Sequence, residues 1–136
     1  MTAPISAQQV LANQASPYPL GATPLVNSSG NVANAAAVAT LNAVAGKTTY
    51  CTGFSITGTG ATAGLPVVVT LAGLVGGTAS FVYAAAAGAL VANTPLIVNF
   101  PTPLPAFSAA SIILLTCPAL GAGNTNNCAT IYGYAQ

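Results

Sequence analysis

Few side chains in this sequence could carry out chemistry: three cysteines and a single lysine. The thiols are Cys51, Cys117 and Cys128, and Lys47 is the only charged side chain in 136 residues. Asp, Glu, Arg and His are all absent from the sequence. General acid–base catalysis at neutral pH draws mostly on His, Asp and Glu, and Ser or Cys nucleophiles normally need a neighbouring base. We therefore expect that the protein is not an enzyme.

The same scarcity argues against metal, cofactor and nucleic-acid sites. Oxygen-ligated metals need carboxylates, and zinc sites usually take four Cys or His ligands, which three scattered cysteines do not supply. Nucleic-acid binding relies on several cationic contacts to phosphates, whereas the net charge here is +1. We expect no metal, no cofactor and no nucleic-acid partner.

The high apolar content raises the question of a membrane protein. Hydrophobic residues make up 54% of the chain. A membrane-spanning helix needs about 20 consecutive apolar residues, and the longest candidate, residues 81–92, is shorter, Ala-rich and interrupted by Gly88. The N-terminus has no charged region followed by an apolar core, so we expect no secretory signal. These features predict a protein made in the cytosol that is not inserted in a membrane.

The clearest strand pattern lies in residues 47–60 and includes one of the thiols. Its alternation predicts a core face with Tyr50, Phe54 and Ile56 and an opposite face with Thr49, Cys51, Gly53 and Ser55. On that interpretation Cys51 points away from the domain's own core. Its thiol would then be available to a neighbouring molecule.

Three interpretations of the cysteines are open. All three can be separate buried thiols that act as small hydrophobes. Cys117 ends one expected strand and Cys128 begins the next, so a hairpin of these strands would place the two within bridging distance. Alternatively, Cys51 cross-links neighbouring subunits. A reducing cytosol would postpone any disulfide until the assembled protein leaves the cell.

The rest of the chain predicts one all-β domain behind an N-terminal arm. We assign residues 1–22 to the arm, in which Ser6 and Gln9 form a capping-box pattern for a short helix that is marginal alone. Residues 23–136 alternate short strands with turn signals. Expected strands are residues 23–27, 34–43, one strand within 47–60, 65–74, 78–84, 95–100, 111–117 and 128–134. This pattern predicts a single antiparallel β-sandwich or jelly roll.

Two further features concern the placement of individual strands. Pro101, Pro103 and Pro105 predict an extended segment outside the hydrogen-bonded ladder, at a sheet corner or edge. Residues 111–117 are apolar on both faces, which predicts a central strand.

Residues 43–136 resemble small β-sandwich proteins of tailed bacteriophage particles, especially head decoration (cement) proteins. The segments that carry the resemblance are AVAGKTTYCTGFSITGTGATAG, FPTPLPAFSAASIILLTCPALGAGNTNN and the terminal IYGYAQ. The resemblance implies a jelly-roll subunit, commonly trimeric, that sits across capsomer junctions and stabilises the shell. Its implied partners are further copies of itself and the major capsid protein or other virion subunits, in a virion made in the host cytoplasm.

The near absence of charge departs from most such proteins. It favours attachment through apolar, backbone or disulfide contacts over electrostatic attachment. Two alternatives are another virion component, such as a fibre, neck or tail protein, and a bacterial surface or pilus-like subunit. A glycan-binding fibre domain would need exposed aromatic rings, for which Tyr18, Tyr132 and Tyr134 are the candidates.

Overall fold

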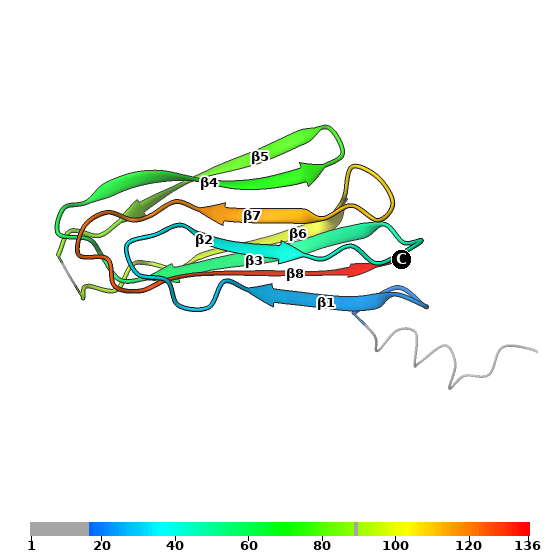
Figure 1. Ribbon diagram of the computed structural model, residues 1–136, viewed down its shortest axis with the longest axis horizontal. Helices are drawn as coiled ribbons and strands as arrows, with labels where there is room; N and C mark the ends of the chain where they lie inside the picture. The colour runs from blue at the N-terminus through cyan, green and yellow to red at the C-terminus, as the bar shows by residue number, and fades with distance from the viewer. Residues whose placement is uncertain (1–16, 89) are drawn as a thin grey trace, which may run out of the picture.

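The computed structural model of the chain describes residues 17–88 and 90–136, and these form two antiparallel β-sheets packed face to face (Figure 1). The predicted all-β sandwich is confirmed. The short helix expected in the arm lies outside the described residues. The C-terminus lies at the end of the sandwich where the first strand begins, because Thr23 pairs with Ala135.

Each sheet contains four of the eight strands. The strands are β1 (Thr23–Ser28), β2 (Ala37–Leu41), β3 (Thr49–Gly58), β4 (Leu65–Leu74), β5 (Gly77–Ala85), β6 (Leu96–Pro105), β7 (Ile113–Cys117) and β8 (Asn127–Ala135). One sheet has the order β1-β8-β3-β6 and the other β2-β7-β4-β5. The expected central position of residues 111–117 is confirmed, since β7 lies between β2 and β4.

The strand pairing is that of a jelly roll. The first strand pairs with the last, β2 with β7, β3 with β6 and β4 with β5, as in one long hairpin. Rolling this hairpin up adds the pairings of β3 with β8 and β4 with β7, which close the two sheets. Eight strands in this order form the double-sheet jelly roll.

The core fills the space between the sheets with the alternate residues of each strand. In β4 the predicted inward face of Val67, Val69 and Leu71 is buried, as is Tyr83 in β5. The largest fully buried apolar side chains are Phe54, Leu41, Ile56, Leu71, Ile113, Leu115, Leu120, Ile131 and Val69. Both sheets contribute to this set, so the domain has one shared core.

One irregularity in β3 reverses the expected alternation. Between Cys51 and Gly53, β3 has one residue more than β8, because Cys51 pairs with Gly133 and Gly53 with Tyr132. This β-bulge moves the inward face from odd to even residue numbers. Thr49 and Cys51 are therefore buried before the bulge, and Phe54 and Ile56 after it. The prediction that Cys51 faces away from the core is wrong.

The prolines of β6 behave as predicted in part. The pairing of β6 with β3 runs from Leu96 to Asn99 and resumes only at Leu104, so Pro101 and Pro103 lie outside the register. Pro105 differs from the expectation, because it lies opposite Tyr50 within the ladder. The strand forms the edge of its sheet, where a missing backbone N–H is tolerated.

Candidate functional site

Cys51 is a core residue and not a surface thiol. Its side chain is fully buried, and Sγ lies 3.6 Å from the backbone oxygen of Gly53. Burial raises the pKa of the Cys51 thiol from 9.0 to about 11. Since the thiolate is the reactive form, Cys51 cannot cross-link a neighbouring subunit while the domain stays folded.

Cys117 and Cys128 lie in different sheets. Cys117 ends β7 and is buried in the core, whereas Cys128 belongs to β8 in the opposite sheet. These two strands do not form the hairpin that a Cys117–Cys128 bridge would require, because the chain crosses from one sheet to the other between them. All three cysteines are free thiols, so the interpretation with separate thiols describes them best, although Cys128 is only partly buried.

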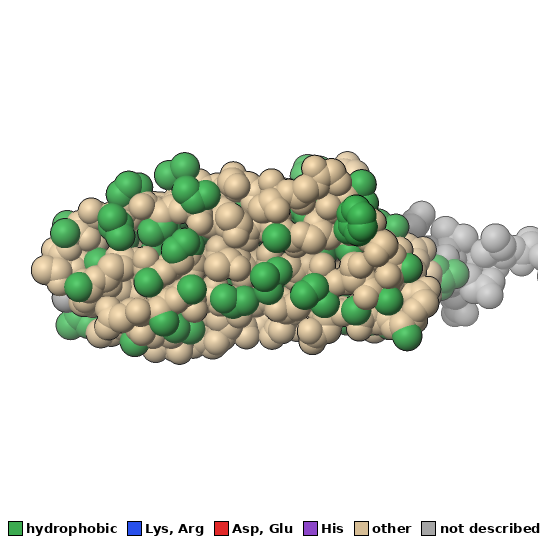
Figure 2. Space-filling model, turned by 45° about the horizontal axis from the view of Figure 1, so that its top comes forward, with side chains coloured by type: hydrophobic (Ala, Val, Ile, Leu, Met, Phe, Trp, Pro, Cys, Tyr) green, Lys and Arg blue, Asp and Glu red, His purple; other side chains and the backbone are tan. Residues whose placement is uncertain are grey.

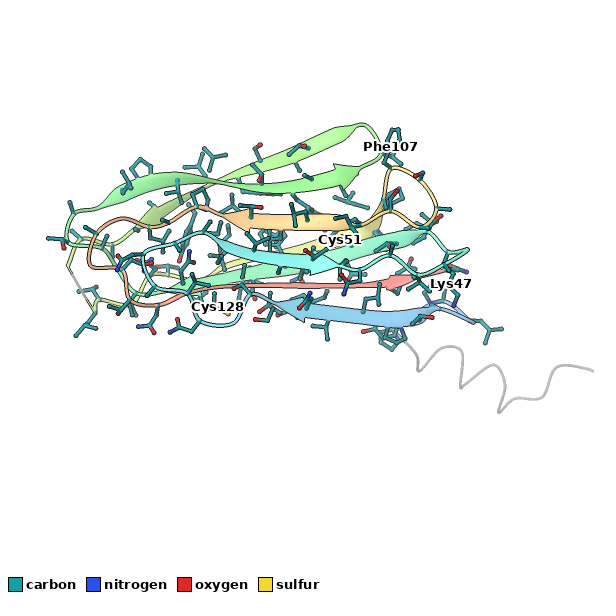
Figure 3. All side chains as sticks on the ribbon, viewed as in Figure 1. Lys47, Cys51, Phe107 and Cys128 are labelled. Atoms are coloured by element: carbon teal, nitrogen blue, oxygen red, sulfur yellow. The ribbon has the colours of Figure 1, made fainter. Side chains whose placement is uncertain are left out.

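Cys128 is the thiol that borders the surface (Figure 3). It lies at the pairing of β8 with β1, where its Sγ is 3.4 Å from Ser28 Oγ. Thr130 Oγ1 donates a hydrogen bond to the same Ser28 oxygen at 3.4 Å. Hydroxyl groups do not act as a base toward a thiol at neutral pH, so this cluster lacks the partner that a nucleophilic cysteine needs.

Lys47 has a structural position. Its Nζ donates hydrogen bonds to the backbone oxygen of Gly21 at 3.1 Å and to Thr23 Oγ1 at 2.8 Å. These contacts join the β2–β3 connection to the residues that lead into β1. The only charged side chain of the protein thus binds the residues at the start of β1.

The tyrosines proposed for glycan binding have unequal exposure. Tyr134 is 7% exposed, because its ring stacks on Tyr50 with centroids 5.1 Å apart and meets the edge of Tyr18 at 6.1 Å. Tyr132 is 39% exposed, and its hydroxyl lies 3.2 Å from Ser55 Oγ. Only one of the two C-terminal tyrosines therefore presents its ring to solvent.

Asparagines at the opposite end of the sandwich connect its loops, and the sequence analysis did not identify them. Asn124 is fully buried and donates through Nδ2 to the backbone oxygens of Thr59 at 2.6 Å and Asn126 at 2.9 Å. Asn93 accepts a hydrogen bond from the backbone N–H of Ala86 at 2.6 Å. No local signal in these Gly- and Asn-rich loops distinguishes a buried asparagine from an exposed one.

The pocket at one sheet turn is smaller than a usual small-molecule site. A pocket of about 210 Å³ lies at the β4–β5 turn and is lined by residues 74–79. Ligand pockets usually have volumes of about 300–1,000 Å³. In residues 17–88 and 90–136, no group of three or more His, Cys, Asp or Glu side chains could hold a metal ion. That part of the chain also contains no helix long and apolar enough to cross a membrane.

The surface carries almost no charge and presents scattered apolar side chains. Figure 2 shows hydrophobic side chains scattered among neutral groups over the visible face, with no acidic or basic patch. The large hydrophobic residues with more than half of their area exposed are Leu20, Val26, Val75, Val82, Leu90, Ile97 and Phe107. Such a surface cannot rely on charge repulsion to keep copies of the protein apart.

No protein-family model, curated protein or solved structure matches this chain.

Proposed function

We propose that this protein is a structural component of a virion, a decoration (cement) subunit that stabilises the shell of a bacteriophage head. The observation that carries the proposal is an eight-stranded jelly roll whose 136 residues include one charged side chain. Jelly rolls serve as viral capsid domains, as lectins and as cupins. A cupin-type metal site needs ligands that this chain lacks, and the uncharged surface suits permanent contact with other protein subunits.

The mechanism we propose is multivalent attachment. Each subunit makes a modest apolar and backbone contact with the shell, and an assembly of several subunits turns these contacts into avidity without a strong single site. The resemblance to phage decoration proteins implies that this assembly is a trimer of identical subunits attached to the major capsid protein. A covalent variant would have to use Cys128, since Cys51 and Cys117 are buried.

A second candidate is another virion component, such as a fibre, neck or tail protein. Tyr132 favours a glycan-binding fibre among these, because its exposed ring borders the hydroxyls of Ser55 and Thr130 on the outer face of one sheet. A bacterial surface or pilus-like subunit is the third candidate. It would be found on cells and not in virus-sized particles.

Sedimentation of native source material tests the proposal, followed by a non-reducing gel of the fast-sedimenting fraction. We expect the chain to travel with virus-sized particles and to remain on them after gentle washing. If the particle-bound chain runs as a monomer on the non-reducing gel, the structural role stands and attachment through disulfides is excluded. A chain that stays at the top of the gradient as a small soluble species would overturn the virion assignment.

A further inference from the structure

The two sheets have four edge strands, and these differ in how they are protected. The edges are β1 and β6 in one sheet and β2 and β5 in the other. An edge strand presents unpaired N–H and C=O groups that can pair with a strand of another molecule. Natural proteins block such edges with prolines, charged side chains, short strands or covering groups.

Three of the four edges carry a protective feature. Strand β6 contains three prolines, which cannot donate backbone hydrogen bonds. Strand β1 contains Pro24 and begins next to the ammonium group of Lys47. Strand β2 has only five residues, and Asn27 Nδ2 donates to its Thr40 backbone oxygen at 2.8 Å.

Strand β5 has none of these features. Its nine residues, GTASFVYAA, include no proline and no charged side chain. It pairs with β4 from Ala79 to Ala85 without interruption, so the strand is regular. Among the described residues, no backbone group of Gly77–Ala85 makes a hydrogen bond outside the strand ladder. The edge of β5 is therefore long, regular from Ala79 to Ala85, and open.

The side chains beside this edge are uncharged and include two exposed valines. Val82 is 74% exposed and lies directly opposite Val68 of β4, which is 50% exposed. The same outer face continues with Val38 of β2, 43% exposed, and no charged side chain belongs to the strands of this sheet. A partner that pairs with β5 would therefore meet no charge on this face and would lie beside Val82.

We propose that β5 pairs in antiparallel orientation with β5 of a second copy of this chain. A strand and its copy related by a twofold axis are antiparallel and self-complementary, so one contact surface serves both molecules. A partner with a charged surface would have to lose the hydration of its charges without opposite charges to compensate. A second copy brings no charge to this face and joins the two β2-β7-β4-β5 sheets into one continuous sheet.

This contact goes beyond the proposed function. It is a property of the purified protein and does not require a viral shell. A dimer seen in solution would support the contact even if the chain never sediments with particles. Conversely, the chain could be found on particles and yet be monomeric when purified. That result would support the proposed function and contradict the β5 contact.

Sedimentation velocity of the purified full-length chain tests the pairing. We expect a dimer, and we expect Val82→Lys to abolish it, because the twofold pairing would bring the added charges of the two copies close together on one face of the joined sheet, where like charges repel. The matched control is Val26→Lys on edge strand β1, where the side chain is 68% exposed, and this variant should stay dimeric. Both side chains point to solvent, so circular dichroism should show an intact fold.

Three outcomes would overturn the pairing: a monomeric wild type at about 100 µM, a dimer that survives Val82→Lys, or a dimer that Val26→Lys abolishes equally. A trimer of the purified protein would be a fourth such outcome, because it would contradict the twofold contact and favour the trimeric assembly that the resemblance implies. Should Val82→Lys fail to fold, Ser80→Lys on the same exposed face of β5 takes its place. Hydrogen exchange adds a direct measurement, because the amides of residues 77–85 should exchange more slowly in the dimer than in the monomeric variant.

Discussion

At the scale of single residues, the burial of Cys51 depends on one additional amino acid in β3. Side chains alternate strictly along a regular strand, so an inserted residue moves every later side chain to the opposite face. The bulge between Cys51 and Gly53 brings both Cys51 and Phe54 into the core. The alternation alone placed Cys51 with the polar residues, and the thiol expected to be accessible is instead one of the most protected.

The three thiols should react with very different rates. We expect Cys128 to react with a thiol reagent in the native protein, whereas Cys51 and Cys117 should react only after unfolding. For Cys51, a pKa of about 11 in place of 9.0 lowers the thiolate fraction about 100-fold at neutral pH, and burial blocks access as well. Mass spectrometry after timed alkylation measures the reaction rate of each thiol.

A Cys128→Ser variant is the control for the labelling experiment. It should lose the fast native reaction and keep the two slow thiols. Fast labelling of Cys51 in the folded variant would contradict the buried position of this side chain.

Gly133 should not tolerate a side chain. A Cβ at this position would collide with the backbone oxygen of Tyr50 and the Leu41 side chain, both in packed strands. We expect Gly133→Ala to lower the free energy of unfolding by about 1–3 kcal/mol, the usual cost of overpacking. Urea denaturation measures the change. The matched control is Gly64→Ala, whose Cβ would make only ordinary contacts. An equal loss of stability in both variants would contradict the explanation by steric collision.

At the scale of the elements, the loops between strands are held by side-chain amides. The Nδ2 group of Asn124 connects two loops. It donates to the backbone oxygen of Thr59 in the neighbouring loop and to that of Asn126 in its own loop. Backbone contacts reinforce this end, as when Asn34 donates to the Asn124 backbone oxygen at 2.9 Å. Order in these Gly-rich loops therefore comes from buried hydrogen bonds and not from local conformational preference.

Removing the Asn124 amide should loosen this end. We expect Asn124→Ala to lower the free energy of unfolding by about 1–3 kcal/mol, because the partly buried backbone oxygen of Thr59 loses its side-chain donor and that of Asn126 keeps only the Thr59 N–H. Asn126→Ala is the control, since its Nδ2 contacts at 3.1 and 3.5 Å reach hydroxyl groups at a less buried position. Thermal unfolding of both variants measures the loss of stability in each. A larger loss in Asn126→Ala would contradict the role of the Asn124 amide.

At the scale of the whole molecule, the near absence of charge determines how stability responds to solution conditions. Carboxylates and histidines normally cause acid denaturation, and this chain contains neither. The side-chain groups with shifted pKa values are thiols and phenols, which titrate in the alkaline range. Burial raises the pKa values of Cys51, Cys117 and Tyr83, and nearby Asn127 and Asn93 partly oppose the shifts of Cys117 and Tyr83.

The unfolding temperature should be nearly constant between about pH 3 and 8, because almost nothing but the chain termini titrates there. A buried thiol with a raised pKa contributes stability that is fully present below the unfolded pKa of 9.0 and is lost as the pH approaches about 11. Stability should therefore fall above about pH 9. Calorimetry across the range measures this, and a shift of many degrees between pH 4 and 7 would contradict it.

The sequence alone determined the fold class and most strand positions. Alternating or continuous apolar runs between turn signals located the eight strands, although the pattern of residues 34–43 also suited a helix. The prolines of β6 indicated an edge, and the lack of acids, bases and histidine directed the interpretation away from catalysis.

Only the tertiary structure decided which thiol reaches the surface, which asparagines hold the loops and which edge is open. These properties depend on contacts between residues far apart in the chain. The bulge in β3 is defined by its pairing with β8, and Cys117 and Cys128 are separated because β7 and β8 enter different sheets. Local periodicity specifies the face of a strand, but the neighbours that cover the face and the edge follow from how the sheets are assembled.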